Sequence, residues 1–313
     1  MFSVRKLYLT AIIISLSFLL ILGCTKKDNK PSKAGKNKST TQTYTDLKFD
    51  KSAVTSDPFN DPKGPYYHKV YKATSEDGLN FTRETEVMLD KASVPDIVKT
   101  KDGRLIIYAV DGSGRSFANL MLAISKDNGD SWKTGSLHID TGDGQQIGAA
   151  DPQAVLTDDG KIRLFYLVFP EKKPPLDENG QPKPTGEKTK IKSAISNDGI
   201  NFKEEKGARY ESTDFITDPD VVKIGNKWFM YVSKGRELIA ASSTDGDTFK
   251  YDKSIRTTGS VSKTVATGGG KYRQFYCGDG GIDSAVTSDG LNWTDEEGSR
   301  LKTEQEEIIC DPT

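Results

Sequence analysis

The sequence contains only two histidines, His68 and His138, which lie far apart in a chain of 313 residues. They are too few and too scattered for a zinc site or a Ser-His-Asp triad. The glycine-rich segment Thr267–Lys271 lacks the Gly-Lys-Ser/Thr ending of a phosphate-binding loop. We therefore expect no metal and no cofactor. A formal net charge of −1 argues against electrostatic binding to nucleic acid. No long amphipathic helical pattern is present.

One short phrase occurs five times along the chain. Each copy places Ser or Thr, then Asp and Gly, ahead of an aromatic residue. The copies are Ser75–Phe81, Ser125–Trp132, Ser196–Phe202, Ser243–Phe249 and Thr287–Trp293. Self-similarity at a spacing of roughly 45 residues indicates a repeat architecture.

A second repeated unit precedes four of these phrases. It joins a β-branched run, a turn that contains glycine and an aromatic-rich run, which is a hairpin pattern. The copies are Val94–Tyr108, Asp151–Tyr166, Asp218–Tyr231 and Val261–Tyr276. Four antiparallel strands per repeat correspond to one propeller blade. We therefore predict an all-β fold, a five-bladed β-propeller with four complete blades and an incomplete fifth blade.

The fifth blade is expected to be incomplete because the two ends of the chain do not supply four strands. Tyr66–Glu84 provides only the outer two strands, and the sequence stops at Ile309–Thr313, where an inner strand should begin. This pattern suggests a truncated gene product or an open propeller. A long polar segment, Pro170–Lys190, also interrupts the second blade. It is typical of a mobile flap or a surface insertion.

The Ser-x-Asp-x-Gly-x-x-Trp/Phe phrase resembles the Asp box of sialidase-type propellers. The Asp-Pro-x-Val-Val phrase resembles the repeat of five-bladed glycoside hydrolases of family 43 and its relatives. Together the two phrases cover residues 66 to 313. The resemblance implies a carbohydrate as ligand or substrate. In the resembled folds the Asp boxes lie opposite the ligand, and their short polar side chains stabilise turns. We therefore interpret these boxes as structural.

Alternating strand direction places the start of each first strand and the end of each second strand on the face away from the Asp boxes, here called the upper face. Glycoside hydrolysis requires one acid and one base or nucleophile, so carboxylates on this face are candidates. Our catalytic candidates are Asp96, Asp151, Asp218 and Asp311, and our substrate-binding candidates are Asp220, Arg115, Lys234 and Arg236.

The resemblance implies a role for these aspartates. In the resembled hydrolases an Asp of the first strand acts as base, another tunes its pKa and a Glu is the acid. Asp151, Asp218 and Asp311 match that Asp, whereas Asp96 lies two residues later in register and Val94 takes the matching place.

Departures from the pattern keep a second hypothesis open. No Glu occupies an equivalent strand start, and Val261 and Lys263 stand at the fourth blade's positions. The Asp-Pro carboxylates could instead be caps at the strand ends. The arginine triad and Tyr/Glu pair of a strict sialidase cannot be assembled. The alternative to a glycosidase is therefore a non-catalytic propeller that binds a glycan or a protein.

Residues 1–24 have the pattern of a bacterial lipoprotein signal peptide. Arg5 and Lys6 precede an apolar run that ends at Gly23 and Cys24. We expect lipidation at Cys24, a disordered polar tether over residues 25–56, and the propeller over residues 57–313. The protein would then be a monomer in the cell envelope, tethered to the membrane by lipid and facing the periplasm or the exterior. In a Gram-negative cell the membrane would be the outer one. The alternative is an uncleaved membrane anchor.

Two cysteines remain once Cys24 is lipidated, and an exported protein can form disulfides. Cys277 ends the second strand of the fourth blade, and Cys310 precedes the first strand of the fifth. Both are expected on the upper face of neighbouring blades. A disulfide would pin the C-terminus. The alternative is two independent core residues, because the sequence sets no distance between them.

Overall fold

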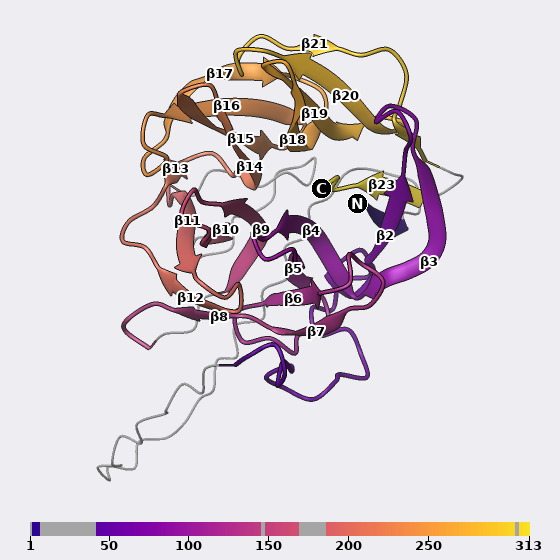
Figure 1. Ribbon diagram of the computed structural model, residues 1–313, viewed down its shortest axis with the longest axis vertical. Coiled ribbons are helices and arrows are strands. Elements are labelled where there is room, and N and C mark those ends of the chain that lie inside the picture. Colours follow the sequence, from indigo (N-terminus) through magenta and orange to yellow (C-terminus); the bar gives the residue numbers. More distant parts are fainter. Residues whose placement is uncertain (1, 7–41, 145–147, 169–185, 304–306) are drawn as a thin grey trace.

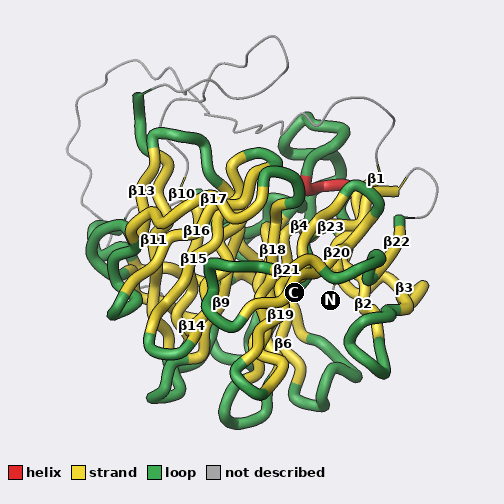
Figure 2. The backbone as a smooth tube through the Cα atoms, turned by 90° about the horizontal axis from the view of Figure 1, so that it is seen from above, coloured by secondary structure: helices red, strands yellow, loops and turns green. Residues whose placement is uncertain are grey.

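A computed structural model describes residues 2–6, 42–144, 148–168, 186–303 and 307–313. Its strands form five sheets arranged around a central axis (Figure 1). Seen from the side, the strands run between two faces that carry loops, and a short 3-10 helix, η1 (Pro65–Tyr67), lies on one of them (Figure 2). The described part of the chain holds no helix with the length and hydropathy of a membrane span.

Four blades are each built from one continuous segment, in the order inner strand to outer strand. Blade one contains β4 (Ala92–Lys99), β5 (Leu105–Asp111), β6 (Leu120–Ser125) and β7 (Lys133–Ser136). Blade two contains β9 (Ala149–Leu156), β10 (Ile162–Val168), β11 (Thr189–Ser196) and β12 (Asn201–Glu204), with β8 (His138–Asp140) on β12 and β13 (Tyr210–Ser212) on β11. Blade three contains β14 (Thr217–Ile224), β15 (Lys227–Lys234), β16 (Glu237–Ser243) and β17 (Lys250–Arg256). Blade four contains β18 (Ser260–Gly268), β19 (Lys271–Gly278), β20 (Gly281–Thr287) and β21 (Thr294–Asp295), with β22 (Leu301–Lys302) on β20.

The fifth blade combines both ends of the chain. Its strands are β23 (Glu307–Cys310), β1 (Phe2–Lys6), β2 (Lys69–Thr74) and β3 (Thr82–Asp90), with β1 antiparallel to both β23 and β2. The prediction of an all-β propeller with four complete blades is confirmed. The inner strand that the sequence analysis placed beyond the chain is partly present as β23, which ends just before Asp311. The N-terminal segment fills the place of the second strand.

The Asp boxes are turns built from side-chain hydrogen bonds. In the second-blade copy, the Asp198 carboxylate accepts the N–H groups of Ile200 and Asn201, both at 2.8 Å. Gly199 has a φ of 80°, which glycine adopts at little cost, and donates its N–H to Ser196 Oγ at 2.9 Å. Burial raises the pKa of Asp198, but hydrogen bonds donated by Asn201, Ile200 and Ser196 outweigh it and lower the pKa. The Asp198 carboxylate therefore stabilises its own turn, which agrees with the structural role expected for the boxes.

The boxes of blades two to five also connect each of these blades to the one before it. The second strand of each continuous blade donates a side-chain hydrogen bond to the box-glycine carbonyl of the next blade. The pairs are Tyr108 to Gly199 (2.9 Å), Arg163 to Gly246 (3.0 Å), Tyr231 to Gly290 (2.8 Å) and Arg273 to Gly78 (3.2 Å). The box aromatic packs edge-on against a ring of the preceding blade, as Phe202 does against Tyr108 at 5.8 Å. Tyr108, Tyr166 and Tyr231 are fully buried, as expected for core residues.

Residues 42–56 belong to the packed domain rather than to a tether. Tyr44 and Leu47 pack against the core shared by blades one to three, and Phe49 packs beside blade one. The N–H of Ser136 donates to Lys48 O at 3.0 Å. Part of the segment expected as a tether, which includes Tyr44, Leu47 and Phe49, therefore packs against the propeller. These three apolar side chains were enough to anchor a segment that is otherwise polar. Residues 25–41 and most of Pro170–Lys190 lie outside the described residues.

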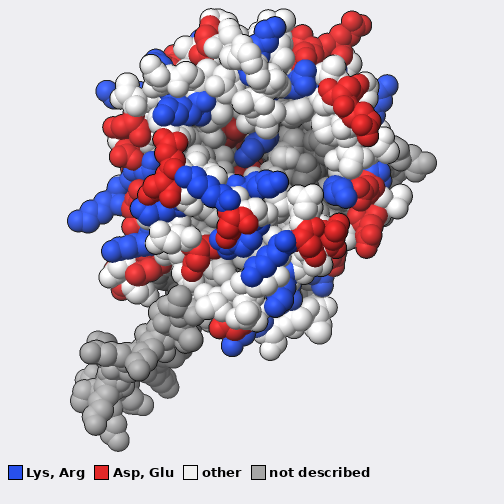
Figure 3. Space-filling model, in the orientation of Figure 1, with Lys and Arg blue, Asp and Glu red and all other residues white. Residues whose placement is uncertain are grey.

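The molecular surface carries mixed charge. The face displayed in Figure 3 has acidic and basic side chains interspersed, and it is hollowed near the centre. Such mixing follows from nearly equal numbers of the two charges, 44 basic and 45 acidic residues.

Candidate functional site

Four inner strands each carry one residue in the left-handed conformation at an equivalent position, and the fifth such residue directly follows β23. These residues are Val94, Asp151, Asp218, Val261 and Asp311, with φ between 48° and 55°. In the four continuous blades the inner hairpin shows a register shift at this point. Left-handed backbone is strained for an L-residue, more so for a β-branched valine than for aspartate. Such strain concentrates at functional sites, so this ring is a candidate site.

Three of the five ring residues are aspartates that line one small cavity on the axis, which we call the axial pit. Its volume is about 30 Å³, and it is lined by the ring residues and their neighbours on the inner strands. Asp151 and Asp218 are adjacent in the ring, and the Asp218 N–H donates to Asp151 Oδ2 at 3.2 Å. The Asp218 carboxylate accepts the Thr217 hydroxyl at 2.6 Å. Going around the ring, Val261 lies between Asp218 and Asp311, and Val94 lies between Asp311 and Asp151.

Asp96 also lines the pit, but its carboxylate is neutralised. It forms a buried ion pair with Lys263, accepts the Ala154 N–H at 2.6 Å and accepts the Thr313 hydroxyl at 2.8 Å. Thr313 Oγ1 in turn accepts the Ile97 N–H at 2.9 Å. Because three blades and the C-terminus meet on this one carboxylate, Asp96 holds the inner strands together. The ion pair between Asp96 and Lys263 therefore has a structural role.

Asp220 lies beneath the pit, with 1% of its surface exposed. Its Oδ2 accepts the Thr264 hydroxyl at 2.6 Å and the Ser262 hydroxyl at 3.2 Å. No hydrogen-bond donor among the described residues reaches its Oδ1. Burial raises the pKa of Asp220, although Lys263 and Thr264 oppose the shift. Asp220 was expected to bind substrate at the upper face, yet its side chain is buried.

The three basic candidates lie away from the pit. The Arg115 guanidinium stacks on the Phe49 ring at 3.5 Å and donates to Ser113 Oγ at 2.7 Å. Lys234 pairs with Asp214 at 2.9 Å. Arg236 pairs with Asp279 across two hairpins and lines a separate groove. The structure therefore brings together the four candidate catalytic aspartates and disperses the candidate cations.

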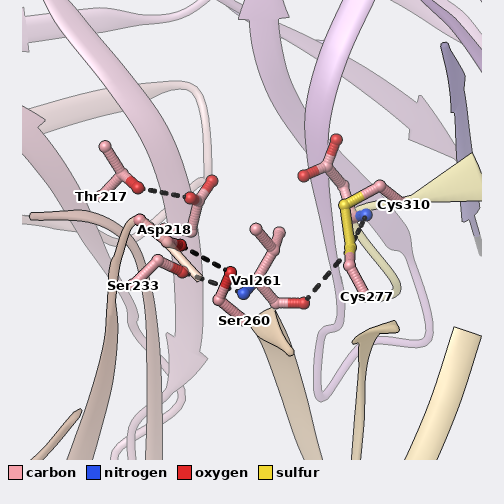
Figure 4. Close-up of a disulfide and its surroundings, with 9 residues drawn as sticks. Thr217, Asp218, Ser233, Ser260, Val261, Cys277 and Cys310 are labelled. Carbon is pink, nitrogen blue, oxygen red and sulfur yellow. Dashed lines mark hydrogen bonds between the residues drawn. A yellow bond between two sulfur atoms is a disulfide. The ribbon is translucent and has the colours of Figure 1, made fainter. Parts of the chain in front are cut away.

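A disulfide joins Cys277 and Cys310, with their Cα atoms 5.2 Å apart. It links the end of β19 to the end of β23 and lies beside the ring (Figure 4), where Val261 separates it from Asp218. The Asp311 N–H donates to Cys277 Sγ at 3.3 Å. Of the two arrangements that the sequence left open, the bridge is the one found. It holds Asp311 at the pit.

Two features of the site were missed from the sequence. Lys263 was noted as a departure from the pattern, but not as the partner of Asp96, which lies 167 residues away. The sequence did contain a clue: Lys263 follows Val261 by two residues, just as Asp96 follows Val94 by two residues, so the two side chains occupy equivalent positions in their blades. Thr313 gave no signal. Among the described residues, no group of three or more His, Cys, Asp or Glu side chains could hold a metal ion.

Similarity to known proteins lies in the fold. Neither a family model nor a curated protein matches the sequence. A protein of unknown function from Dyadobacter fermentans has a TM-score of 0.53 and 16% identity, covering 74% of this chain and 72% of that one. A thermostable family-43 glycoside hydrolase has a TM-score of 0.51 and 15% identity, covering 68% and 74%. An α-L-arabinanase from Penicillium chrysogenum has a TM-score of 0.50 and 14% identity, covering 66% of each chain. The chain thus has a β-propeller fold of the kind that glycoside hydrolases use.

Proposed function

We propose that this protein acts on carbohydrate at the axial pit and hydrolyses a glycosidic bond there. The observation that carries the proposal is the placement of Asp151, Asp218 and Asp311 on strained backbone around one cavity. Two propellers of similar fold support it, since one is a family-43 glycoside hydrolase and the other an arabinanase described in complex with arabinobiose.

The geometry suggests a division of labour between two neighbouring carboxylates. Asp151 lies next to Asp218 in the ring and accepts its backbone N–H at 3.2 Å. Asp151 would act as base and take a proton from the attacking water. Asp218 would donate a proton to the departing glycosidic oxygen, so that one water is consumed per bond cleaved. Asp311 would contact the sugar from the opposite side of the ring.

The test is hydrolysis of a panel of aryl glycosides by the full chain and by Asp151→Asn and Asp218→Asn. Each variant should lose at least about a hundredfold in turnover, because acid–base groups contribute on that order, while unfolding midpoints stay unchanged. Asp158→Asn is the matched control, since Asp158 is an exposed aspartate in the β9–β10 turn of the same blade. Unfolding of both pit variants would instead identify the Asp-Pro carboxylates as structural caps.

A non-catalytic glycan-binding propeller is the second candidate. It is favoured by the small volume of the pit and by its lining, since none of the described residues that line it is a glutamate. Binding to a glycan array without turnover of any aryl glycoside would support this function over hydrolysis.

We also propose that the protein is a lipoprotein of the bacterial cell envelope, with lipid on Cys24. The basic, apolar and Gly-Cys pattern of residues 1–24 supports this. Cleavage before Cys24 would remove β1 and leave β23 and β2 without the strand that pairs with both. That pairing favours the alternative, in which the N-terminal segment is an uncleaved membrane anchor. Incorporation of a palmitate analogue into the chain, and its loss in Cys24→Ser, distinguishes the two.

A further inference from the structure

A second and larger depression lies between blades three and four. We call it the β17–β20 groove, and its volume is about 600 Å³. It is lined by Arg236 in the β15–β16 turn, by Arg256 and Gly259 at and after the end of β17, and by Tyr276, Asp279 and Asp283 around the β19–β20 hairpin. Sites for small ligands commonly measure about 300–1,000 Å³, a range that includes the groove but not the axial pit of about 30 Å³.

The groove presents a planar cation that is already held in place. The Arg256 guanidinium stacks on the Tyr276 ring at 3.7 Å. It donates to Gln274 Oε1 at 3.0 Å and to Asp295 Oδ1 at 3.2 Å. A guanidinium has five N–H donors, and these bonds use two of them. Because its orientation is set before any ligand arrives, little entropy is lost when further hydrogen bonds form.

Tyr276 and Asp283 add an aromatic ring, a hydroxyl and a carboxylate on facing strands. They are cross-strand partners in the β19–β20 hairpin. Burial raises the pKa of Tyr276 to about 12, so its hydroxyl stays protonated, and it donates to Asp295 at 3.2 Å. The Asp283 carboxylate lies directly over Gly278, where a Cβ would approach Oδ2 to 1.9 Å. Glycine at 278 is therefore needed for Asp283 to take this position.

The groove also contains a spare buried hydroxyl. Ser254 Oγ is buried, and no hydrogen-bond partner reaches it among the described residues. Hydroxyls, carboxylates, a guanidinium and an aromatic ring are the side chains that bind sugars, since each sugar hydroxyl can both donate and accept. This lining suits a chain of hydroxyl groups better than an apolar ligand.

Charge selects among such ligands. Two arginines, Arg236 and Arg256, face three aspartates, Asp279, Asp283 and Asp295, so the lining carries one net negative charge. The Arg236–Asp279 ion pair joins the hairpins of the two blades at the groove. A ligand that carries carboxylates would be repelled here, whereas a neutral one would not.

The groove and the pit are neighbours along the chain. Gly259 lines the groove, and Val261, two residues later, lines the pit. Ser260, between them, donates its hydroxyl to Gly235 O at 2.8 Å and holds this crossing in place. Only Ser260 therefore separates a residue that lines the groove from a residue that lines the pit.

We propose that the β17–β20 groove binds the body of a neutral oligosaccharide whose end enters the axial pit. This inference rests on the proposed carbohydrate function for its link to the pit, but the groove has its own binding groups. It makes the substrate a neutral glycan chain of several units rather than an acidic sugar or a single monosaccharide.

The test uses the full chain on a glycan array of neutral, amino-substituted and carboxylate-bearing oligosaccharides of one to six units. Arg256→Lys keeps the charge but loses the planar fork, so affinity for the longer neutral glycans should fall about five- to tenfold, as for one lost hydrogen bond. Arg83→Lys is the matched control, because Arg83 lies over the Tyr71 ring at 4.9 Å in blade five, outside the groove. Thermal melting confirms that both variants fold.

Each outcome decides between the proposals. Loss of binding to the longer neutral glycans in Arg256→Lys but not in Arg83→Lys supports the groove. If no glycoside is hydrolysed but that selective loss is seen, hydrolysis fails and the groove inference stands. Equal binding of acidic and neutral glycans, an equal loss in both variants, or no binding by the folded protein to any arrayed glycan overturns the groove inference.

Discussion

Removing the Cys277–Cys310 disulfide is expected to loosen the C-terminal part of blade five and displace Asp311 from the pit. The bridge joins residues separated by 33 positions, and it connects β19 of blade four to β23 of blade five. The next residues along the chain are Asp311, which lines the pit, and then Thr313, which donates to Asp96 at 2.8 Å. A double substitution, Cys277→Ser with Cys310→Ser, removes the cross-link and keeps the side chains small.

The loss follows from the entropy of the unfolded chain. For a closed loop of 33 residues, the chain-entropy relation gives about 4 kcal/mol at 25 °C. For a protein of this size, that corresponds to a fall in Tm of about 6 °C. The N–H of Asp311 would also lose its contact with Cys277 Sγ.

The assay is urea unfolding of the oxidised wild type, the reduced wild type and the double serine variant. The reduced protein and the variant should agree within about 1 kcal/mol, since both lack the same constraint. Binding to the glycan array should weaken with the stability loss, because Asp311, one of the three ring carboxylates, is no longer held in place. A variant as stable as the oxidised protein would refute the reasoning, since the C-terminus would then be held by β23 pairing alone.

Three further changes test individual parts of the fold. Asp220→Asn should leave stability unchanged or raise it near pH 7. Because the pKa of Asp220 is raised in the folded state, the stability of the wild type relative to this variant should fall as pH rises above about 4. Urea unfolding at several pH values measures this difference. Val261→Asn should stabilise the protein by about 1 kcal/mol by relieving left-handed strain, and a lower unfolding midpoint would contradict this. Asp198→Ala should destabilise by about 1–3 kcal/mol, because it leaves the N–H groups of Ile200 and Asn201 without their acceptor. Since the pKa of Asp198 is lowered, its contribution should be present above about pH 4 and be lost as pH falls below that; a pH-independent difference between wild type and Asp198→Ala would argue against this.

Local sequence determined the blades and the structural role of the Asp boxes. A turn of Ser, Asp and Gly closes through contacts within five residues, so each box, such as Ser196–Asn201, forms wherever its phrase occurs. Repetition of that phrase and of the hairpin unit then sets the number of blades. The aspartates before proline were recognised for the same reason: they occupy one position in a repeating register. The polar composition of residues 42–56, by contrast, concealed three apolar anchors.

The content of the pit was decided by tertiary structure. Asp96 was a catalytic candidate by register, and only closure of the ring brought Lys263 against it from a strand 167 residues away. Asp151 and Asp218 lie side by side because their blades are adjacent in the ring. Arg115, Lys234 and Arg236 contact Phe49, Asp214 and Asp279 instead of the pit. The order of the blades, rather than distance along the sequence, determines which side chains are in contact. Repeat patterns report each strand's own position, whereas a site on the axis depends on side chains from several blades at once. The physical reason is that charge pairing, burial and disulfide formation act through space, after the repeats have closed.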